Sequence, residues 1–231
     1  MGDRLRPGRI GVRLPPLYPI VNVAGGTAAA CERAFALAVE LAEAGAPLLQ
    51  LRAKTLGAGA MSELARRTVE ALAGSGCLLL VNDRVDVAAA SGAAGVHLGD
   101  EDLPVEAARR VLDAARAEGA ARAIVGYSTH SVAEAAACCG LDADYLGFGP
   151  VFESPTKAGV RDARGLGLLE GACRVSELPV VAIGGVTLET AAACWKAGAA
   201  SVAVISEIER SGDRRALVAA YRHAARESGL A

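Results

Sequence analysis

Short apolar runs alternate with longer amphipathic segments along this chain, which is the pattern of repeated β-strand and α-helix units around a parallel sheet. The predicted strands are Leu17–Val23, Pro47–Arg52, Cys77–Val81, Gly95–Leu98, Ala123–Tyr127, Asp144–Phe148, Val180–Ile183 and Ser201–Ile205. The predicted helices are Ala28–Ala44, Ala60–Ala73, a short one after Arg84, Pro104–Ala117, Val132–Cys139, Leu166–Val175, Leu188–Ala197 and Arg215–Arg226. This strict alternation favours an α/β fold of the closed (β/α)8, or TIM, barrel type over an open doubly wound sheet.

The chain is predicted to form a single catalytic domain over residues 15–231, because no composition break interrupts that stretch. Residues 1–14 are rich in arginine and are expected to form a basic, solvated extension that need not be ordered. Ser131 and Glu134 have the spacing of a capping box, and Pro104 suits the first turn of its helix. Glycines at 45, 119, 140 and 198 fall where helices should stop. The irregular stretch Glu153–Gly165 predicts a mobile loop after the sixth strand.

Composition and charge narrow the class of function. A formal net charge of −2 provides no broad basic field, so nucleic acid is not expected as a partner. We expect no membrane span, since no apolar run has the necessary length, and the basic start lacks the apolar core of a secretory signal. The six cysteines lack zinc-like spacing and are expected to be reduced, so the prediction is a cytoplasmic enzyme. Whether it forms a homo-oligomer is left open.

Polar residues follow the predicted strands at the end where barrels of this type carry their active sites. Gln50, Arg52 and Lys54 alternate along the second strand and its end, so all three side chains can face the barrel mouth. Two positive charges and an amide on one side would suit a diphosphate, although a cluster of solvated charges explains the triplet about equally well.

Carboxylates end the next two strands. Asp83 follows the third strand and Asp102 follows the fourth, so the two should meet as a pair of hard oxygen ligands. Mg²⁺ commonly takes one or two carboxylates and completes its shell with water and substrate phosphates. Negative charge at a helix start explains either aspartate singly, but not their position beside the Arg52 and Lys54 side chains.

Weaker signals come from the remaining strand ends. Ser128 is free to donate a hydrogen bond into the mouth, whereas His130 is expected to be idle and His97 to serve the core or support the site. Ser154, Thr156 and Lys157 could hold a phosphate on the loop after the sixth strand. Backbone N–H groups at Gly184, Gly185, Ile205 and Ser206 match the phosphate pocket that such barrels build after strands seven and eight, although simple tight turns would use the same residues. The residues thus predict two anion sites, one for a diphosphate and one for a monophosphate.

At these same positions the chain resembles the thiamine phosphate synthase family, within the superfamily that also contains the thiazole tautomerases. The resemblance rests on segments at 50–54, 81–86, 95–104, 147–152, 154–157, 182–185 and 204–206, which run in family order over nearly the whole barrel. Each is short, but the set together is specific. The resemblance implies that a hydroxymethylpyrimidine diphosphate couples with a thiazole phosphate to give thiamine phosphate and diphosphate. The implied mechanism is a dissociative, Mg²⁺-assisted substitution without a strong base.

The resemblance also assigns roles. It implies that the pyrimidine diphosphate is held by Gln50, Arg52, Lys54, Asn82, Ser128 and Lys157, and that the catalytic residues among them are Arg52, Lys54, Ser128 and Lys157. It implies that Mg²⁺ is held by Asp83 and Asp102. The thiazole phosphate would be contacted by Ser154, Thr156, Gly184, Gly185, Ile205 and Ser206. The chain departs from the family pattern at Ala53 for Glu, Asp100 for Gln and Ser154 for Thr.

Three other functions are weighed against this one. A thiazole tautomerase shares the barrel and the stretch from Thr129 to Ser131, but Pro150, Asp83 and Lys54 favour the synthase. A non-catalytic barrel that binds thiamine precursors and regulates a partner would not need the full set of charges. A sugar-phosphate isomerase should show an acid and a base on opposite strand ends, and no convincing pair occurs.

Overall fold

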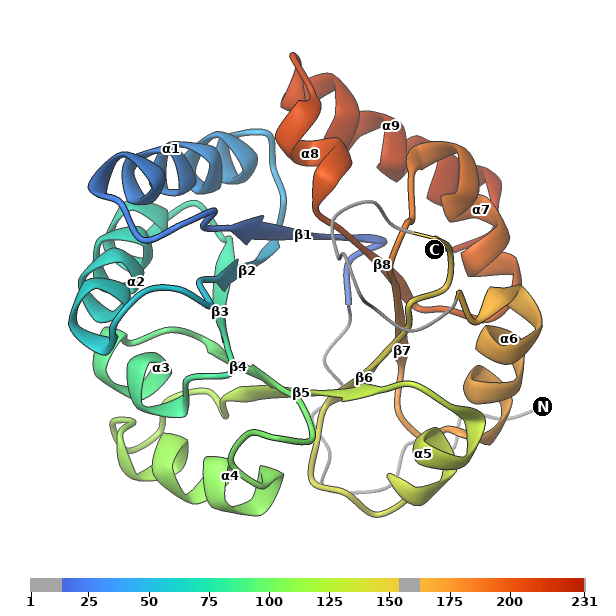
Figure 1. Ribbon diagram of the computed structural model, residues 1–231, viewed down its shortest axis with the longest axis horizontal. Coiled ribbons are helices and arrows are strands. Elements are labelled where there is room, and N and C mark those ends of the chain that lie inside the picture. The colour runs from blue at the N-terminus through green and yellow to red at the C-terminus, as the bar shows by residue number, and fades with distance from the viewer. Residues whose placement is uncertain (1–13, 154–162, 231) are drawn as a thin grey trace.

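The computed structural model describes residues 14–153 and 163–230, and in them eight parallel strands close into a barrel in the order β1 to β8. The strands are β1 Leu17–Asn22, β2 Leu48–Arg52, β3 Leu78–Asn82, β4 Gly95–Leu98, β5 Ile124–Thr129, β6 Tyr145–Phe148, β7 Val180–Ile183 and β8 Ser201–Val204. The helices are α1 Ala28–Glu43, α2 Ala58–Leu72, α3 Val85–Ser91, α4 Val105–Ala114, α5 Val132–Ala137, α6 Gly165–Val175, α7 Leu188–Lys196, α8 Ser206–Arg210 and α9 Arg214–Glu227. They surround the barrel as an outer ring (Figure 1). The predicted fold class is therefore confirmed.

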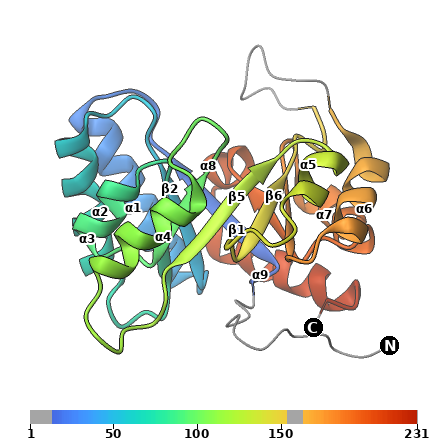
Figure 2. The ribbon, with the colours of Figure 1, turned by 90° about the horizontal axis from the view of Figure 1, so that it is seen from below.

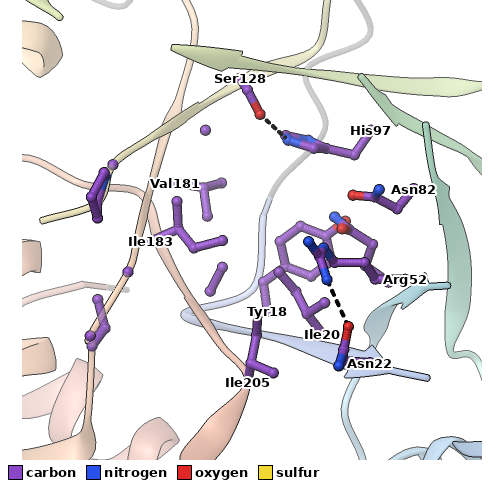
Figure 3. A pocket seen from close by; sticks show the side chains of 18 of the residues that line it. Tyr18, Ile20, Asn22, Arg52, Asn82, His97, Ser128, Val181, Ile183 and Ile205 are labelled. Carbon is purple, nitrogen blue, oxygen red and sulfur yellow. Dashed lines mark hydrogen bonds between the residues drawn. The ribbon is translucent and has the colours of Figure 1, made fainter. Parts of the chain in front are cut away.

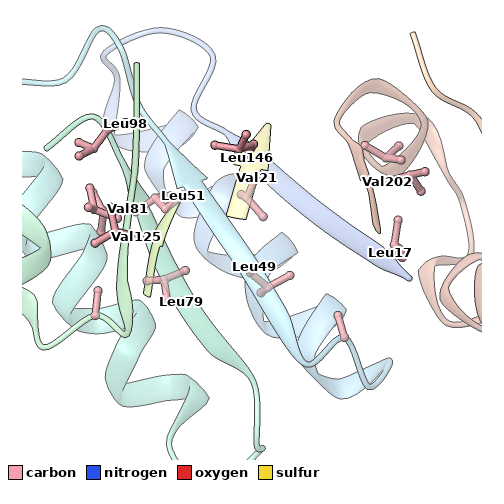
Figure 4. Close-up of a cluster of buried hydrophobic side chains, with 14 of the residues drawn as sticks. Leu17, Val21, Leu49, Leu51, Leu79, Val81, Leu98, Val125, Leu146 and Val202 are labelled. Atoms are coloured by element: carbon pink, nitrogen blue, oxygen red, sulfur yellow. The ribbon is translucent and has the colours of Figure 1, made fainter. Parts of the chain in front are cut away.

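Alternation along each strand sorts the side chains into two cores. One set points outward to the helices and forms the larger apolar cluster, including Leu49 and Leu51 of β2 and Leu79 and Val81 of β3 (Figure 4). In Figure 2 the strands cross the molecule between α1–α4 on one side and α6 and α7 on the other, so this outward set is covered all round. That burial explains why the predicted strands read as almost continuous apolar runs.

The other set points into the barrel and changes character along the strand direction. Tyr18, Leu48, Leu80 and Ile124 belong to the smaller cluster that fills the barrel interior. Two residues later the inward positions of β2 and β3 become polar, as Gln50 after Leu48 and Asn82 after Leu80 show, whereas those of β1 and β7 stay apolar with Ile20 and Ile183. The sequence therefore closes one end of the barrel with apolar side chains, and at the carboxyl ends of the strands it places polar groups on β2 and β3 opposite apolar ones on β7 and β8.

Helix punctuation follows the sequence in most places. The Ser131 hydroxyl accepts the Glu134 N–H at 3.1 Å, while the Glu134 carboxylate accepts the N–H of His130 at 2.7 Å. All four glycines at the predicted stops have positive φ, from 81° at Gly119 to 100° at Gly198. Pro104 stands as the N-cap, one residue before α4 begins. The short helix α8 is additional to the eight predicted.

Some boundaries differ from the sequence prediction. β5 runs to Thr129, two residues further than expected, so Ser128 lies within a strand and pairs in register with Gly147. Leu14, assigned from sequence to the extension, is buried within the interior cluster. The rest of that extension and most of the predicted loop lie outside the described residues. In the described ranges no helix is long and apolar enough to cross a membrane. All six cysteines are free.

Candidate active site

A cavity of about 1120 Å³ opens at the carboxyl ends of the strands. Its lining includes every predicted site residue that the structure describes: Gln50, Arg52, Lys54, Asn82, Asp83, Asp102, Ser128, Gly184, Gly185, Ile205 and Ser206. Ser154, Thr156 and Lys157 lie outside the described residues. One cavity thus brings together side chains from six strands and the turns that follow them.

The cationic wall comes from β2 and is held by its neighbours. The Arg52 guanidinium donates to the Asn22 side-chain oxygen of β1 at 2.7 Å. Asn22 pairs directly with Arg52 in the β1–β2 register, so the parallel sheet itself sets this contact. The Lys54 ammonium lies 3.5 Å from an Asp83 carboxylate oxygen, at the end of β3. Both positive groups are therefore aimed toward one side of the cavity before any ligand binds.

The carboxylate pair is formed by Asp83 and Asp102. Asp83 has a φ of 66°, a left-handed conformation, immediately after β3. Asp102 accepts the N–H of Gly99 at 2.6 Å and so closes the turn after β4. Burial raises the pKa of the Asp102 carboxyl, and contact with the Asp83 carboxyl raises it further. Neither carboxylate is itself an N-cap residue, because Arg84 and Pro104 hold those positions.

A chain of hydrogen bonds crosses the barrel beneath the cavity. The Gln50 side-chain N–H donates to the Tyr18 hydroxyl at 2.9 Å, and the Tyr18 and Tyr145 hydroxyls are 3.0 Å apart. The Tyr145 hydroxyl lies 2.9 Å from Nδ1 of His97, and Nε2 of His97 lies 2.8 Å from the Ser128 hydroxyl. Figure 3 shows the hydrogen bond that joins His97 to Ser128, with His97 on the same side of the cavity as Asn82 and Arg52. Five strands, β1, β2, β4, β5 and β6, each supply one member.

Glycines make room for this chain. A Cβ on Gly126 would come within 2.1 Å of the Tyr145 ring and 2.5 Å of His97 Nδ1. A Cβ on Gly147 would lie 3.1 Å from the His97 ring. The two rings stack, with centroids 5.5 Å apart, in the space that these missing side chains leave. Two inward positions in β5 and β6 are therefore glycine because aromatic rings occupy the barrel there.

Burial sets the protonation state of the side chains in this hydrogen-bonded chain. It lowers the pKa of His97 to about 4, although the nearby Asp83 carboxylate acts in the opposite direction. Burial also raises the pKa of Tyr145 well above its ordinary value, and the neighbouring Tyr18 adds to that shift. The imidazole and the phenol are thus both neutral at physiological pH.

The opposite wall is apolar. Ile20, Val181, Ile183, Ala203 and Ile205 from β1, β7 and β8 line it, and Figure 3 shows the branched side chains facing the polar group of Arg52, Asn82 and His97. This wall can receive an uncharged ring while the polar wall receives charge.

The turn after β7 packs tightly against the turn after β6. Gly184 and Gly185 have φ values of 93° and 66°. A Cβ on Gly184 would come within 2.5 Å of Pro150, and one on Gly185 within 2.3 Å of the Glu153 carbonyl oxygen. The sequence explained both glycines by the approach of a phosphate, but the protein's own neighbouring loop already requires them. Their backbone still lines the cavity.

Comparison with known proteins identifies the family. The family model described as thiamine monophosphate synthase matches residues 17–208. A thiamine-phosphate synthase of Anaeromyxobacter dehalogenans is 45% identical over 187 residues, which are 81% of this chain and 80% of that one. The chain belongs to the thiamine monophosphate synthase family.

Other members agree. The thiamine-phosphate synthase of Gloeobacter violaceus is 44% identical over 170 residues, 73% of this chain but 47% of that longer one. The solved structure of a thiamine phosphate pyrophosphorylase from Pyrococcus furiosus superposes with a TM-score of 0.76 at 31% identity, covering 92% of this chain and 96% of that one. The family resemblance stated from the sequence is confirmed.

Two departures from the family pattern can now be placed. Ala53 is 6% exposed and packs with the outward-facing cluster, so its methyl group points away from the cavity. Asp100 lines the cavity together with Glu101 and Asp102, which makes that edge more acidic. In the described parts of the chain, no three His, Cys, Asp or Glu side chains gather as a metal centre, so Asp83 and Asp102 stand as a pair.

Sequence reasoning missed several cavity residues, of which four make polar contacts that matter for the site. Asn22, Tyr18 and Tyr145 were not singled out, and neither was Glu207 of α8. Tyr18, Ile20 and Asn22 are alternate residues of β1 and point to the same side, into the barrel, so strand alternation alone could have marked Tyr18 and Asn22 as cavity residues. Glu207 carried no such signal, because its contact with the Tyr221 hydroxyl of α9 depends on how two helices pack.

Proposed function

We propose that this member of the family couples 4-amino-2-methyl-5-hydroxymethylpyrimidine diphosphate with 4-methyl-5-(2-phosphooxyethyl)thiazole, giving thiamine phosphate and diphosphate. The observation that carries the proposal is a single cavity whose charged wall, from β2 to β4, faces an apolar wall from β1, β7 and β8. A reaction that expels a diphosphate from one ring system and attaches another needs both kinds of surface together.

The diphosphate is proposed to bind against Arg52, Lys54 and Asn82. A planar guanidinium can take two phosphate oxygens, while the ammonium acts as a point charge. Because Asn22 fixes the Arg52 side chain at 2.7 Å, the ligand meets a group already oriented. Lys157 is proposed for the same diphosphate from its sequence position alone, since it lies outside the described residues.

Asp83 and Asp102 are proposed to hold Mg²⁺. Two adjacent carboxylates, one with its pKa raised by burial and by the other, repel each other without a cation between them. That donor chemistry fits a hard divalent ion that completes its shell with water and phosphate. When bound, Mg²⁺ would supply positive charge to the departing diphosphate. Asp100 and Glu101, at the same edge, add to the negative potential that attracts it.

The chemistry is proposed to be dissociative substitution. The bond between the pyrimidine methylene and the diphosphate oxygen breaks, both electrons leave with the oxygen, and the thiazole nitrogen then donates its lone pair to the methylene carbon. No residue needs to remove a proton. Arg52 and Lys54 stabilise the developing negative charge, and the walls hold the two rings in line.

The thiazole phosphate is proposed to lie at the β7 and β8 ends. Gly184, Gly185, Ile205 and Ser206 present backbone there, and Ile183 and Ile205 offer apolar contact to the ring. Ser154 and Thr156 are proposed to contact the same phosphate from the loop outside the described residues. We further propose a cytoplasmic location, in keeping with six free cysteines.

The test is a coupling assay with both phosphorylated substrates, with and without Mg²⁺, monitored for thiamine phosphate and diphosphate. The matched variants are Arg52→Met, in the cavity, and Arg84→Met, whose exposed guanidinium donates to Asp86 at 2.8 Å through its Nε and does not line the cavity. We expect Mg²⁺-dependent product from the wild type and Arg84→Met, and a rate reduced by about a hundredfold or more in Arg52→Met. Absence of product from folded wild-type protein would refute the proposal.

One observation keeps the tautomerase as a second candidate. His130 lines the cavity, and its Nδ1 lies 2.7 Å from the Gly149 carbonyl oxygen, so its other ring nitrogen is the one available to a ligand. The same assay, run with tautomers of the thiazole phosphate alone, separates the two activities. Isomer conversion lost in His130→Ala, without coupling, would favour the tautomerase.

A further inference from the structure

The hydrogen-bonded chain beneath the cavity has a direction. Gln50 is 2% exposed, and its side-chain nitrogen donates to the Tyr18 oxygen. A phenol has one proton to give, and the remaining partner of the buried Tyr18 hydroxyl is Tyr145. Tyr18 must therefore donate to Tyr145. By the same reasoning Tyr145 must donate to its other partner, Nδ1 of His97. With Gln50 donating to Tyr18, the opposite direction would leave a buried hydroxyl proton without an acceptor.

The direction fixes the His97 tautomer. A ring nitrogen that accepts a hydrogen bond carries no hydrogen, so an imidazole whose Nδ1 accepts from Tyr145 is neutral and has one hydrogen. Because Nδ1 accepts from Tyr145, the hydrogen is on Nε2. The Nε2–H then donates to the Ser128 oxygen, 2.8 Å away. The His97 and Tyr145 rings stack, with 22° between their planes, in this arrangement.

We propose that His97 is a positioning residue that occupies the Ser128 oxygen with a hydrogen bond and thereby turns the Ser128 proton into the cavity. Ser128 then presents a donor, and the substrate atom that it meets must be an acceptor, such as a ring nitrogen or a phosphate oxygen. Gln50 lies at the other end of these hydrogen bonds. Its side-chain nitrogen faces Tyr18, so its carbonyl oxygen is left as an acceptor toward the ligand. This inference rests on the proposed function for the identity of the substrate, but not for the geometry.

Cooperativity gives the arrangement a chemical consequence. Each hydroxyl that accepts a hydrogen bond becomes a better donor, and four such bonds precede the Ser128 proton. A donor strengthened in this way stabilises negative charge that develops on an accepting oxygen, as it does on a departing diphosphate. A neutral His97 also adds no positive charge of its own to the cavity, so it does not compete with Arg52 for the anion.

The first test measures the tautomer directly and needs no activity. In protein labelled with ¹⁵N-histidine, the His97 resonances are identified by their loss in His97→Gln. We expect a neutral ring with the hydrogen on Nε2. Tyr145→Phe, which removes the donor to Nδ1, should shift the ring toward the other tautomer. Tyr127→Phe, in β5 but outside the cavity lining, should leave the spectrum unchanged. A hydrogen on Nδ1 in the wild type would overturn the proposal.

The second test separates positioning from a merely structural role. The side-chain nitrogen of Gln can replace Nε2 of His97 and still donate to Ser128, whereas that of Asn reaches only the place of Nδ1. We expect His97→Gln to retain kcat/KM within about tenfold of the wild type, roughly the effect of one weakened hydrogen bond. His97→Asn should fall to the level of Ser128→Ala. Equal losses in the Gln and Asn variants, at equal melting temperatures, would overturn the proposal.

The two tests also separate the inference from the proposed function. If the wild type lacks coupling activity but His97 carries its hydrogen on Nε2, the proposed function fails and the directed chain stands. If coupling occurs and the hydrogen is on Nδ1, the reverse holds.

Discussion

The carboxylate pair predicts that Asp83→Asn will make the metal-free protein more stable. Two like unit charges about 4 Å apart interact by about 4 kcal/mol at an effective dielectric near 20 and by about 1 kcal/mol in water. The Lys54 ammonium, 3.5 Å from Asp83, and the raised pKa of Asp102 each relieve part of that repulsion. Loss of the half-exposed Lys54 contact should cost well under about 1 kcal/mol. We therefore expect a net gain of about 1 kcal/mol.

The backbone supports the same substitution. Asp83 has a φ of 66°, and asparagine tolerates this left-handed conformation at least as well as aspartate does. No backbone strain should therefore offset the gain. In a barrel of this size, about 1 kcal/mol corresponds to a melting temperature roughly 2–4 °C higher.

Mg²⁺ should reverse the order of stability, so that the wild type becomes more stable than Asp83→Asn. If the pair binds the ion, Mg²⁺ at ten times its Kd stabilises the wild type by about 1.4 kcal/mol, while the variant, with one carboxylate, gains much less. The assay is thermal unfolding in EDTA and across an Mg²⁺ titration, with coupling activity measured in parallel. Asp86→Asn, which changes an exposed aspartate three residues away that does not line the cavity, is the control. A variant less stable than wild type in EDTA, or equally stabilised by Mg²⁺, would refute the reasoning.

Three further predictions concern the barrel. In chemical denaturation, Gly126→Ala should lower the free energy of unfolding by about 1–3 kcal/mol, because its Cβ would meet the Tyr145 ring at 2.1 Å, and it should also reduce activity. The control Gly59→Ala, in open space in α2, should be neutral or stabilising in the same measurement. In native protein at pH 8, a thiol reagent should modify exposed Cys139 rapidly and Cys194 slowly by mass spectrometry, since burial raises the pKa of Cys194 to about 12. Arg109→Met should cost about 3–5 kcal/mol in urea unfolding, because it leaves the Asp144 carboxylate, 2.5 Å away, without its cation; the folded variant should keep its activity.

Much of the fold was predictable because the strand runs and helix stops are local signals. The alternation Gln50, Arg52, Lys54 predicted inward-facing groups correctly, since strand periodicity survives in the barrel. The end of β5 was less predictable. Ser128 and Thr129 extend the strand because they pair with Gly147 and Phe148, which are far away in the sequence. No local pattern contains that information.

The site was predictable in its charges but not in its supports. A strand-end Arg or Asp is visible in the sequence, whereas the partner that orients it belongs to another strand. Asn22 holds Arg52 only because the β1–β2 register sets the two side by side. The glycines at 184 and 185 match a phosphate-binding turn in the sequence, whereas their packing against Pro150 and Glu153 depends on how the turns after β6 and β7 meet in the fold.

The buried polar chain explains how one strand pattern serves both stability and chemistry. A polar group inside a barrel is costly unless it is hydrogen-bonded, and an apolar layer would be the simpler filling. Here each of the five side chains has a partner within 3.0 Å, so the layer is satisfied without any charge. With the Gln50 side-chain nitrogen donating to Tyr18, that satisfaction holds for one direction of the protons only. The interior of the barrel therefore specifies, beneath the cavity, which substrate atoms must accept a hydrogen bond and which must donate one.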